Sequence, residues 1–224
     1  MPDSTVTREF IYAPPPDTGL PIIHIDDHIL VLDKPSGLLT VAGNVPERAD
    51  CLEARARKDY PAARIIHRLD MDTSGVIIMA LTPAAQVHIG RQFEKRQVQK
   101  SYIAHVWGHM EAESGRVDQP LITDWPNRPK QHIDPVNGRA AITDWQVIET
   151  MQDYTRVQLT PLTGRSHQLR VHMGFLGHPI LGDNLYAHGD ALAASARLCL
   201  HAEEISFAHP VSDAILTFKS PVPF

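Results

Sequence analysis

The segment that decides the fold reads HRLDMDTSG, residues 67–75, and continues directly into VIIMAL, residues 76–81. The six apolar residues predict a buried strand. The polar segment lies between a predicted helix and this strand, which places it on a structured loop, where functional residues commonly occur. Asp70 is its central carboxylate. Taken alone, an aspartate in a loop is more often a turn or cap residue, so the surrounding sequence must decide its role.

Further strands are predicted on both sides of this segment. The alternating or continuous apolar runs lie in two pieces of residues 22–33 around Asp26-Asp27-His28, and at 101–107, 140–149, 154–160, 203–208 and 214–219. In the 101–107 strand, Tyr102 is expected to face the same side as Ala104, because side chains alternate along a strand.

Three helices are predicted between these strands. One is capped by Asp50 and ends at Tyr60 before Pro61, one starts at Thr82-Pro83, and one follows Thr163-Gly164 and ends at Gly177. Strands and helices interleave without a strict βαβ rhythm. We therefore predict an α+β fold with a mixed, mainly antiparallel central sheet flanked by helices and loops around a cleft.

The chain is expected to form one domain, residues 22–224, behind a flexible arm, residues 1–21, which is rich in proline. Cys51 and Cys199 stand far apart without a CxxC spacing, which favours free thiols in a reducing compartment such as the cytoplasm. No run of eighteen apolar residues occurs, so a membrane span is not expected.

The formal charge of −5 argues at first sight against nucleic acid, because phosphate binding usually needs a basic surface. Net charge is an average, however. Basic residues are dense locally, at Arg91, Lys95, Arg96 and Lys100, at Arg128 and Lys130, and at Arg165 and Arg170. Composition allows either a positive groove on an acidic body or ordinary solvated charges.

Residues 67–75 are similar to the catalytic signature H-R-L-D-x-x-T-S-G of pseudouridine synthases of the RluA type, with every fixed position present. Other segments resemble motifs of the same family in the same order: KPSGLL (34–39), KSYIA (100–104), GRSHQLRVH (164–172), GHPILGD (177–183), LHA (200–202) and FKSP (218–221). The resemblance covers about residues 22–224. It implies the fold of these enzymes and the isomerisation of uridine to pseudouridine in structured RNA.

The resemblance also implies roles for single residues. Asp70 corresponds to the catalytic aspartate, Tyr102 to the active-site tyrosine and Arg170 to the active-site arginine, while Arg68 is expected to fill the place of a flipped base or to grip phosphates. The stretch DWPNRPKQ, residues 124–131, looks like the dual-specificity subgroup, which modifies 23S rRNA and tRNA. The RNA-binding residues expected from this stretch and from the basic segments are Arg68, Asn127, Arg128, Lys130 and Arg165.

The chemistry of the reaction fits these residue types. Breaking the glycosidic bond, turning the uracil and rejoining it through C5 needs neither a redox step nor an external group, so no cofactor is expected. A carboxylate can act by attack on the sugar, by addition to the ring or by removing a sugar proton, and the sequence leaves the three routes open. Because a dry pocket favours a neutral acid, we expect Arg170 to hold Asp70 ionised in a two-pronged pair. Arg170→Ala is then expected to weaken catalysis more than folding.

The remaining residues allow other readings. Tyr102 can stack on uracil or simply pack in the core, and residues 125–130 can bind an RNA loop or form a polar connector. Many relatives carry an S4-type RNA-binding domain, for which the arm is too short, so recognition is expected in the catalytic domain. The protein is expected to act as a monomer without an obligatory protein partner.

Two other functions remain open. The first is a metal-assisted RNA phosphodiesterase that uses Asp70, Asp72 and histidines, and the second is a noncatalytic RNA-binding module. A metal pair formed by His167 and His172 is not expected, because a spacing of five puts them on different faces of a helix or a strand.

Overall fold

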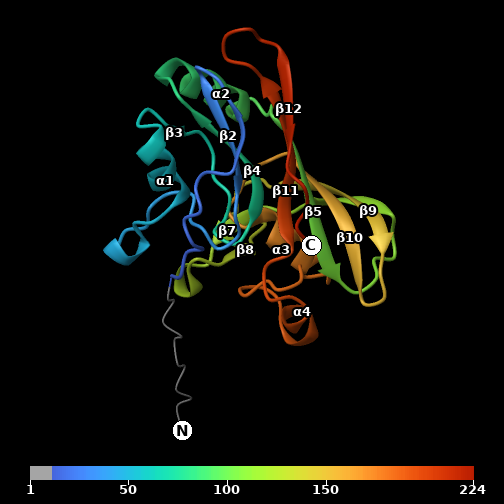
Figure 1. The fold of residues 1–224 in the computed structure, drawn as a ribbon. Coiled ribbons are helices and arrows are strands. Elements are labelled where there is room, and N and C mark those ends of the chain that lie inside the picture. Colours follow the sequence, from blue (N-terminus) through green and yellow to red (C-terminus); the bar gives the residue numbers. More distant parts are fainter. Residues whose placement is uncertain (1–11) are drawn as a thin grey trace.

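The computed structural model describes residues 12–224 (Figure 1). In these residues ten strands form one sheet, in the order β1-β2-β4-β11-β5-β10-β9-β6, with β12 paired to β11 and β3 to β4; β7 and β8 form a separate hairpin. The strands are β1 (Ile22–Ile25), β2 (Ile29–Lys34), β3 (Arg64–Ile65), β4 (Ser74–Ala80), β5 (Gln99–Trp107), β6 (Ser114–Asp118), β7 (Leu121–Thr123), β8 (Gln131–Ile133), β9 (Ile142–Thr150), β10 (Tyr154–Pro161), β11 (Leu200–Ala208) and β12 (Ile215–Lys219).

The pairing confirms the predicted α+β class with a mainly antiparallel sheet. In the large sheet only β4 and β11 run parallel, through Ser74 opposite His201 and Gly75 opposite Ala202. This parallel pair lies in the middle of the sheet, next to β5. The strand that follows residues 67–73 is therefore central.

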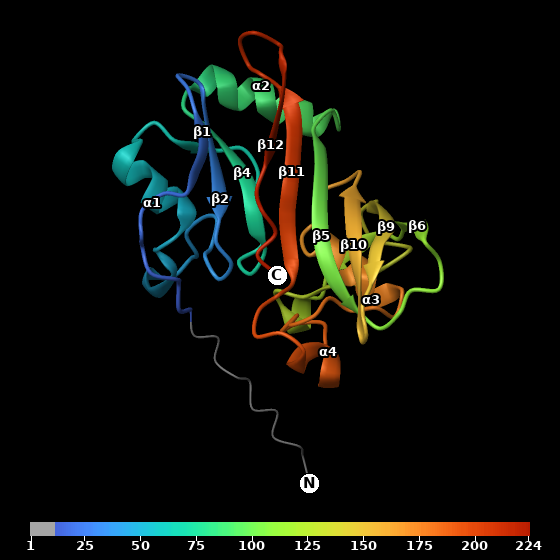
Figure 2. The same ribbon diagram turned by 45° about the vertical axis from the view of Figure 1, so that its right-hand side comes forward.

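Across the described residues, four α-helices lie around the sheet: α1 (Leu52–Asp59), α2 (Pro83–Glu94), α3 (Gln168–Phe175) and α4 (Gly189–Ala193), with 3-10 turns at Pro46–Arg48 and Trp125–Asn127. Figure 2 shows α1 beside β1 and β2 and α3 near β10 and β9, at opposite ends of the row of strands. Helix α2 starts at the predicted Thr82 cap, whose side chain accepts a hydrogen bond from the Ala85 amide.

The predicted cap of α1 is wrong. Cys51 occupies the N-cap position, and its Sγ accepts from the Ala54 amide at 3.4 Å. Asp50 instead accepts two hydrogen bonds from Arg55, at 2.8 and 2.7 Å. The guanidinium offers a charged, bidentate partner, and such pairs are stronger than a neutral backbone donor.

Strands β2 and β4 are buried on both faces, which explains their continuous apolar sequence. On one face, Leu30, Leu32, Ile77 and Met79 pack with Leu52 and Ala56 of α1. On the other, Ile29, Val31, Val76 and Ile78 pack with Ile89 of α2. A second region of the core joins β5, β10 and α3, through residues such as Ala104, Leu159 and Met173.

Of the arm expected at residues 1–21, residues 1–11 lie outside the described part. Residues 12–21 have no helix or strand, and several of their groups bond to the domain. Tyr12 donates to the Asp50 carbonyl and accepts from the Leu39 amide, while Arg55 donates to the Pro15 and Pro16 carbonyls. None of the helices in residues 12–224 is long and apolar enough to cross a bilayer.

Candidate active site

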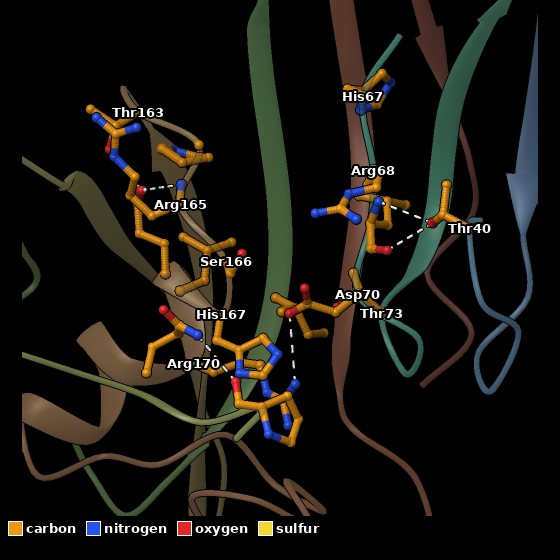
Figure 3. Close-up of a pocket in the computed structure, with 18 of the residues that line it drawn as sticks. Thr40, His67, Arg68, Asp70, Thr73, Thr163, Arg165, Ser166, His167 and Arg170 are labelled. Carbon is orange, nitrogen blue, oxygen red and sulfur yellow. Dashed lines mark hydrogen bonds and ion pairs between the residues drawn. The ribbon is translucent and has the colours of Figure 1, made fainter. Parts of the chain in front are cut away.

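A cavity of about 880 Å³ opens between two walls. One wall is formed by residues 65–73 before and at the start of β4, and the other by residues 161–170, which run from the end of β10 into α3. Figure 3 shows His67, Arg68, Asp70 and Thr73 on the first wall, facing Thr163, Arg165, Ser166 and His167 on the second. Lys100 and Tyr102 of β5 line the cavity between them. The tertiary structure thus joins three segments that the family resemblance selected separately.

The loop that carries Asp70 is held by hydrogen bonds to its backbone. Thr40 donates its hydroxyl to the Leu69 carbonyl at 2.7 Å, and the Lys34 ammonium donates to the Met71 carbonyl at 2.8 Å. Ser36 donates to the Asp72 carbonyl at 2.7 Å. Because these bonds use main-chain atoms, the carboxylate of Asp70 stays free to face the cavity.

Gly75 sets how closely this loop approaches the centre of the sheet. Its φ is +114°, and a Cβ at this position would lie 2.2 Å from the Ala202 carbonyl oxygen. Only glycine adopts this conformation without strain and allows such close contact. The last glycine of the 67–75 segment therefore permits the parallel β4–β11 pairing directly behind Asp70.

The predicted two-pronged pair between Arg170 and Asp70 is wrong. The guanidinium donates to both oxygens of Asp183, from Nε at 2.8 Å and from Nη2 at 2.6 Å. Its contact with Asp70 is a single one of 3.6 Å from Nη1 (Figure 3). Burial alone would lower the pKa of Arg170, but the bonds to Asp183 raise it above the ordinary value. Arg170 is therefore a fixed cation beside Asp70, anchored by another carboxylate.

Tyr102 lies on β5 between the two main parts of the core and is half-buried. It faces the same side as Ala104, as predicted, and lines the cavity beside Asp70. Burial, followed by the negative charge of Asp70, raises the pKa of its hydroxyl. The phenol thus stays protonated at neutral pH and presents its ring to the cavity.

The residues expected to bind RNA divide into two groups. Arg68, Arg128 and Arg165 line the cavity, whereas Asn127 and Lys130 do not. Asn127 instead donates its side-chain amide to Asp124 at 2.9 Å. All of residues 125–130 belong to the tip of the β7–β8 hairpin, next to the cavity opening.

The hairpin tip presents an aromatic surface and a cation together. Trp125 is 66 % exposed, and the Arg128 guanidinium lies 4.9 Å from the centre of its ring. The Gln131 amide donates to the Tyr186 hydroxyl at 2.8 Å, which ties the hairpin to the wall that carries Arg170. Exposed aromatic and cationic groups of this kind suit unstacked bases and phosphates.

Four residues of the site had no assigned role in the sequence analysis. Asp183 anchors Arg170, Lys34 holds the Asp70 loop, Tyr186 packs its ring 5.2 Å from the Arg170 guanidinium, and Lys100 lines the cavity. Asp183, Lys34 and Lys100 lie inside the matched segments, which was the available signal. Tyr186 lies outside them and carried none.

In the part of the chain that the structure describes, no group of three or more histidine, cysteine, aspartate or glutamate side chains can hold a metal ion. His167 bonds the Tyr186 hydroxyl through Nδ1, and His172 bonds the Thr143 hydroxyl and the Gln119 carbonyl. Both histidines therefore have structural partners.

The profile of the RNA pseudouridylate synthase family matches residues 28–174, which include the Asp70 loop, Tyr102 and Arg170. With the sheet, the cavity and the signature all in agreement, the chain belongs to this family of isomerases. Neither the phosphodiesterase nor the noncatalytic alternative is favoured by this result.

Within the family, the chain resembles one kind of enzyme in particular. It is 52 % identical to the dual-specificity RNA pseudouridine synthase RluA of Escherichia coli K12 over 95 % of this chain and 98 % of that protein. It is 51 % identical to the RluA of Yersinia pestis, over 91 % and 99 % of the two chains. Among solved structures, human RNA pseudouridylate synthase domain containing 1 matches with a TM-score of 0.79 and 29 % identity, over 95 % of this chain and 87 % of that one.

Proposed function

We propose that this protein isomerises uridine to pseudouridine in structured RNA with Asp70 as the catalytic carboxylate. The observation that carries the proposal is the position of Asp70, whose side chain is 27 % exposed in the cavity and faces the buried guanidinium of Arg170. A fixed cation favours the charged form of a nearby carboxylate and so offsets the cost of a dry pocket. An ionised carboxylate is the form that each of the three routes requires.

Tyr102 and Arg68 are assigned the handling of the base. The ring of Tyr102 lies beside Asp70 in a cavity large enough for a nucleotide, so it can stack on a uracil that has left its helix. Its protonated hydroxyl is available to assist proton transfer at C5. In Figure 3, Arg68 extends into the space between the two walls, where it can fill the gap in the RNA stack or contact phosphates.

The substrates we propose are a hairpin of 23S rRNA and the anticodon stem-loop of tRNA. This rests on the similarity to the dual-specificity enzymes and on the hairpin tip, residues 124–131, which carries Trp125, Asn127, Arg128 and Lys130 beside the cavity. We further propose that the protein acts in the cytoplasm as a monomer, with residues 22–224 as its catalytic domain.

The test uses stem-loop RNA labelled with tritium at C5 of its uridines, because isomerisation must release this label to water. The wild-type protein should release tritium, and Asp70→Asn should release it at least about 10² times more slowly, as expected when an essential acid or base is lost. Asp59→Asn, which changes an aspartate at the end of α1, is the matched control. Release by the folded Asp70→Asn variant at the wild-type rate would disprove the assignment.

The choice of RNA is tested separately, by mapping pseudouridines in ribosomal and transfer RNA from cells that lack this protein. Loss of one site in a 23S hairpin together with one in a tRNA anticodon stem-loop supports both substrates. Loss in neither would remove the dual specificity but not the reaction.

A further inference from the structure

In and near one wall of the cavity lie four cations that have no acidic partner among residues 12–224. Lys100 and Arg165 line the cavity, while Arg96 and Arg139 are exposed and lie outside its lining. Burial, followed by the charges of Arg139 and Arg96, lowers the pKa of Arg165, so Arg139 and Arg96 each lie close enough to Arg165 to act on its charge. Within residues 12–224, none of the four cations has a carboxylate oxygen within 4.0 Å.

Lys100 is the innermost of these cations. It lies on β5 two residues before Tyr102, so both side chains emerge on the same face of the strand. Among the described residues, its ammonium makes one hydrogen bond, a long one of 3.5 Å to the Thr163 carbonyl. Burial lowers the pKa of Lys100 to about 8, which reflects the absence of a compensating anion.

Lys34, a lysine with a structural role in this fold, differs from Lys100 in the hydrogen bonds of its ammonium group. Its ammonium is also buried, but it donates to three carbonyls, those of Pro35, Leu38 and Met71, at 2.6 to 2.9 Å. All of its donors are thus used inside the protein. Lys100 keeps at least two donors for a group that enters the cavity, since an ammonium has three.

The other cations continue from Lys100 toward the rim. Lys100 Nζ lies 4.0 Å from the position that a Cβ would occupy on Gly164, the residue before Arg165. The turn that carries Arg165 is held by Gln168, whose side-chain oxygen accepts from the Arg165 amide at 3.0 Å and from the Thr163 hydroxyl at 2.7 Å. Arg165 itself donates from Nε to the Ala140 carbonyl at 3.0 Å, next to Arg139. Lys100, Arg165 and Arg139 are therefore neighbours on a fixed framework.

We propose that Lys100, Arg165, Arg139 and Arg96 form a phosphate-binding track, in which Lys100 contacts the backbone phosphate of the nucleotide in the cavity and the three arginines contact the phosphates that follow. The identity of the ligand as RNA rests on the proposed function. A series of cations without carboxylate partners matches the repeated negative charge of a nucleic-acid backbone. It also explains how a protein of net charge −5 can hold RNA at this site.

The first test measures the dissociation constant for a stem-loop RNA as a function of salt. Lys100→Met should weaken binding roughly five- to tenfold near 0.1 M salt and reduce the slope of log K against log salt by about 0.7 to 0.9, the effect of one lost phosphate contact. Lys100→Arg should keep the slope. Lys219→Met is the matched control, because Lys219 lies on β12 away from the cavity and pairs with Glu204.

The second test replaces single phosphates next to the target uridine by neutral methylphosphonates. At the phosphate held by Lys100, the replacement should weaken binding by the wild-type protein as much as Lys100→Met does, and it should not weaken binding by Lys100→Met further. Additive losses at every phosphate tested, or an unchanged salt slope, would overturn the track. Unfolding in urea checks that Lys100→Met is folded.

These readouts do not depend on turnover. Suppose that Lys100→Met lowers the slope of log K against log salt and is insensitive to the methylphosphonate, while the wild-type protein releases no tritium from labelled RNA. The track then stands and the proposed reaction fails. If tritium is released and neither binding readout changes, the reaction stands and the track is wrong.

Discussion

Arg170 connects two carboxylates of unequal role. It donates to both oxygens of Asp183, at 2.8 and 2.6 Å, and lies 3.6 Å from the nearest oxygen of Asp70. Asp183 is fully buried, and Arg170 is 2 % exposed. The buried pair therefore fixes the guanidinium before any substrate arrives, and Asp70 faces a charge that is already in place. This kind of preorganisation avoids a structural change during the reaction.

The buried pair changes the expectation for Arg170→Ala. Removing the arginine leaves Asp183 buried without its partner, so the free energy of unfolding should fall by about 3–5 kcal/mol, together with the loss of activity. Denaturation in urea measures the stability. The double variant Arg170→Met, Asp183→Asn removes both charges and keeps a side-chain oxygen for the Leu185 and Tyr186 amides, so it should regain part of the stability without regaining tritium release. Arg116→Ala, which breaks the exposed pair with Asp144, should cost less than about 1 kcal/mol. Equal stability losses for the two arginine-to-alanine variants would contradict this account.

Gly75→Ala should destabilise the protein by about 1–3 kcal/mol or more. The added methyl group would meet the Ala202 carbonyl at 2.2 Å, and alanine is strained at a φ of +114°. The same substitution at Gly90, inside α2, has no atom within 4 Å of the new Cβ and should stabilise the helix by about 0.5–1 kcal/mol. Thermal and urea unfolding measure both variants. If the close approach of β4 to β11 limits residue 75 to glycine, the change in the free energy of unfolding should be negative for Gly75→Ala and positive for Gly90→Ala.

His67 should make the protein sensitive to acid. Its Nε2 accepts a hydrogen bond from the Ile78 amide at 3.0 Å, which requires a neutral ring. Burial, followed by the charge of Lys100, lowers its pKa to about 3. In the unfolded chain the histidine has its ordinary pKa of about 6.5, so between about pH 3 and 6.5 the unfolded state binds more protons than the folded state. The contribution of His67 to the free energy of unfolding is therefore full above about pH 6.5 and is lost as the pH falls toward 3.

The matched variant is His67→Gln, whose amide oxygen can accept the same bond without titrating. The stability advantage of the wild-type protein over this variant should shrink between pH 6.5 and 4, by up to about 1.4 kcal/mol per pH unit. Urea denaturation at several pH values measures the difference, in which the other histidines cancel. Parallel stability curves for the two proteins would argue against a neutral His67 in the folded protein.

Variants of Trp125 and Arg128 at the hairpin tip should distinguish the contribution of base stacking to RNA binding from the contribution of charge. Trp125→Ala should weaken stem-loop binding by about 1–3 kcal/mol, the usual contribution of one stacked base, with no change in the salt slope. Arg128→Gln should instead lower the slope by about one. Val136→Ala alters an exposed residue of the turn after β8 and serves as the control. A salt-dependent loss in Trp125→Ala would show that the tryptophan acts mainly by positioning Arg128, which lies 4.9 Å from its ring.

The sequence predicted most of the strands because their signal is local. The continuous apolar run at 76–81 and the alternation around Tyr102 correspond to β4 and β5, and residues 140–149 and 154–160 to the β9–β10 hairpin. The short strands β6 to β8 were missed, because runs of three to five residues contain too little periodicity. The cap of α1 was wrong because Asp50 has a competing charged partner, Arg55, that only the fold brings within reach.

The sequence by itself determined the family, the α+β class and the candidates Asp70, Tyr102 and Arg170, since each of these depends on residue types at fixed spacing. Only the tertiary structure decided which charges meet. Arg170 forms its two-pronged pair with Asp183 rather than with Asp70, and Lys100 lines the cavity beside Tyr102 with no acidic partner in the described part of the chain. Electrostatic pairing depends on distance and burial between side chains far apart in the chain, and neither can be read from spacing along it.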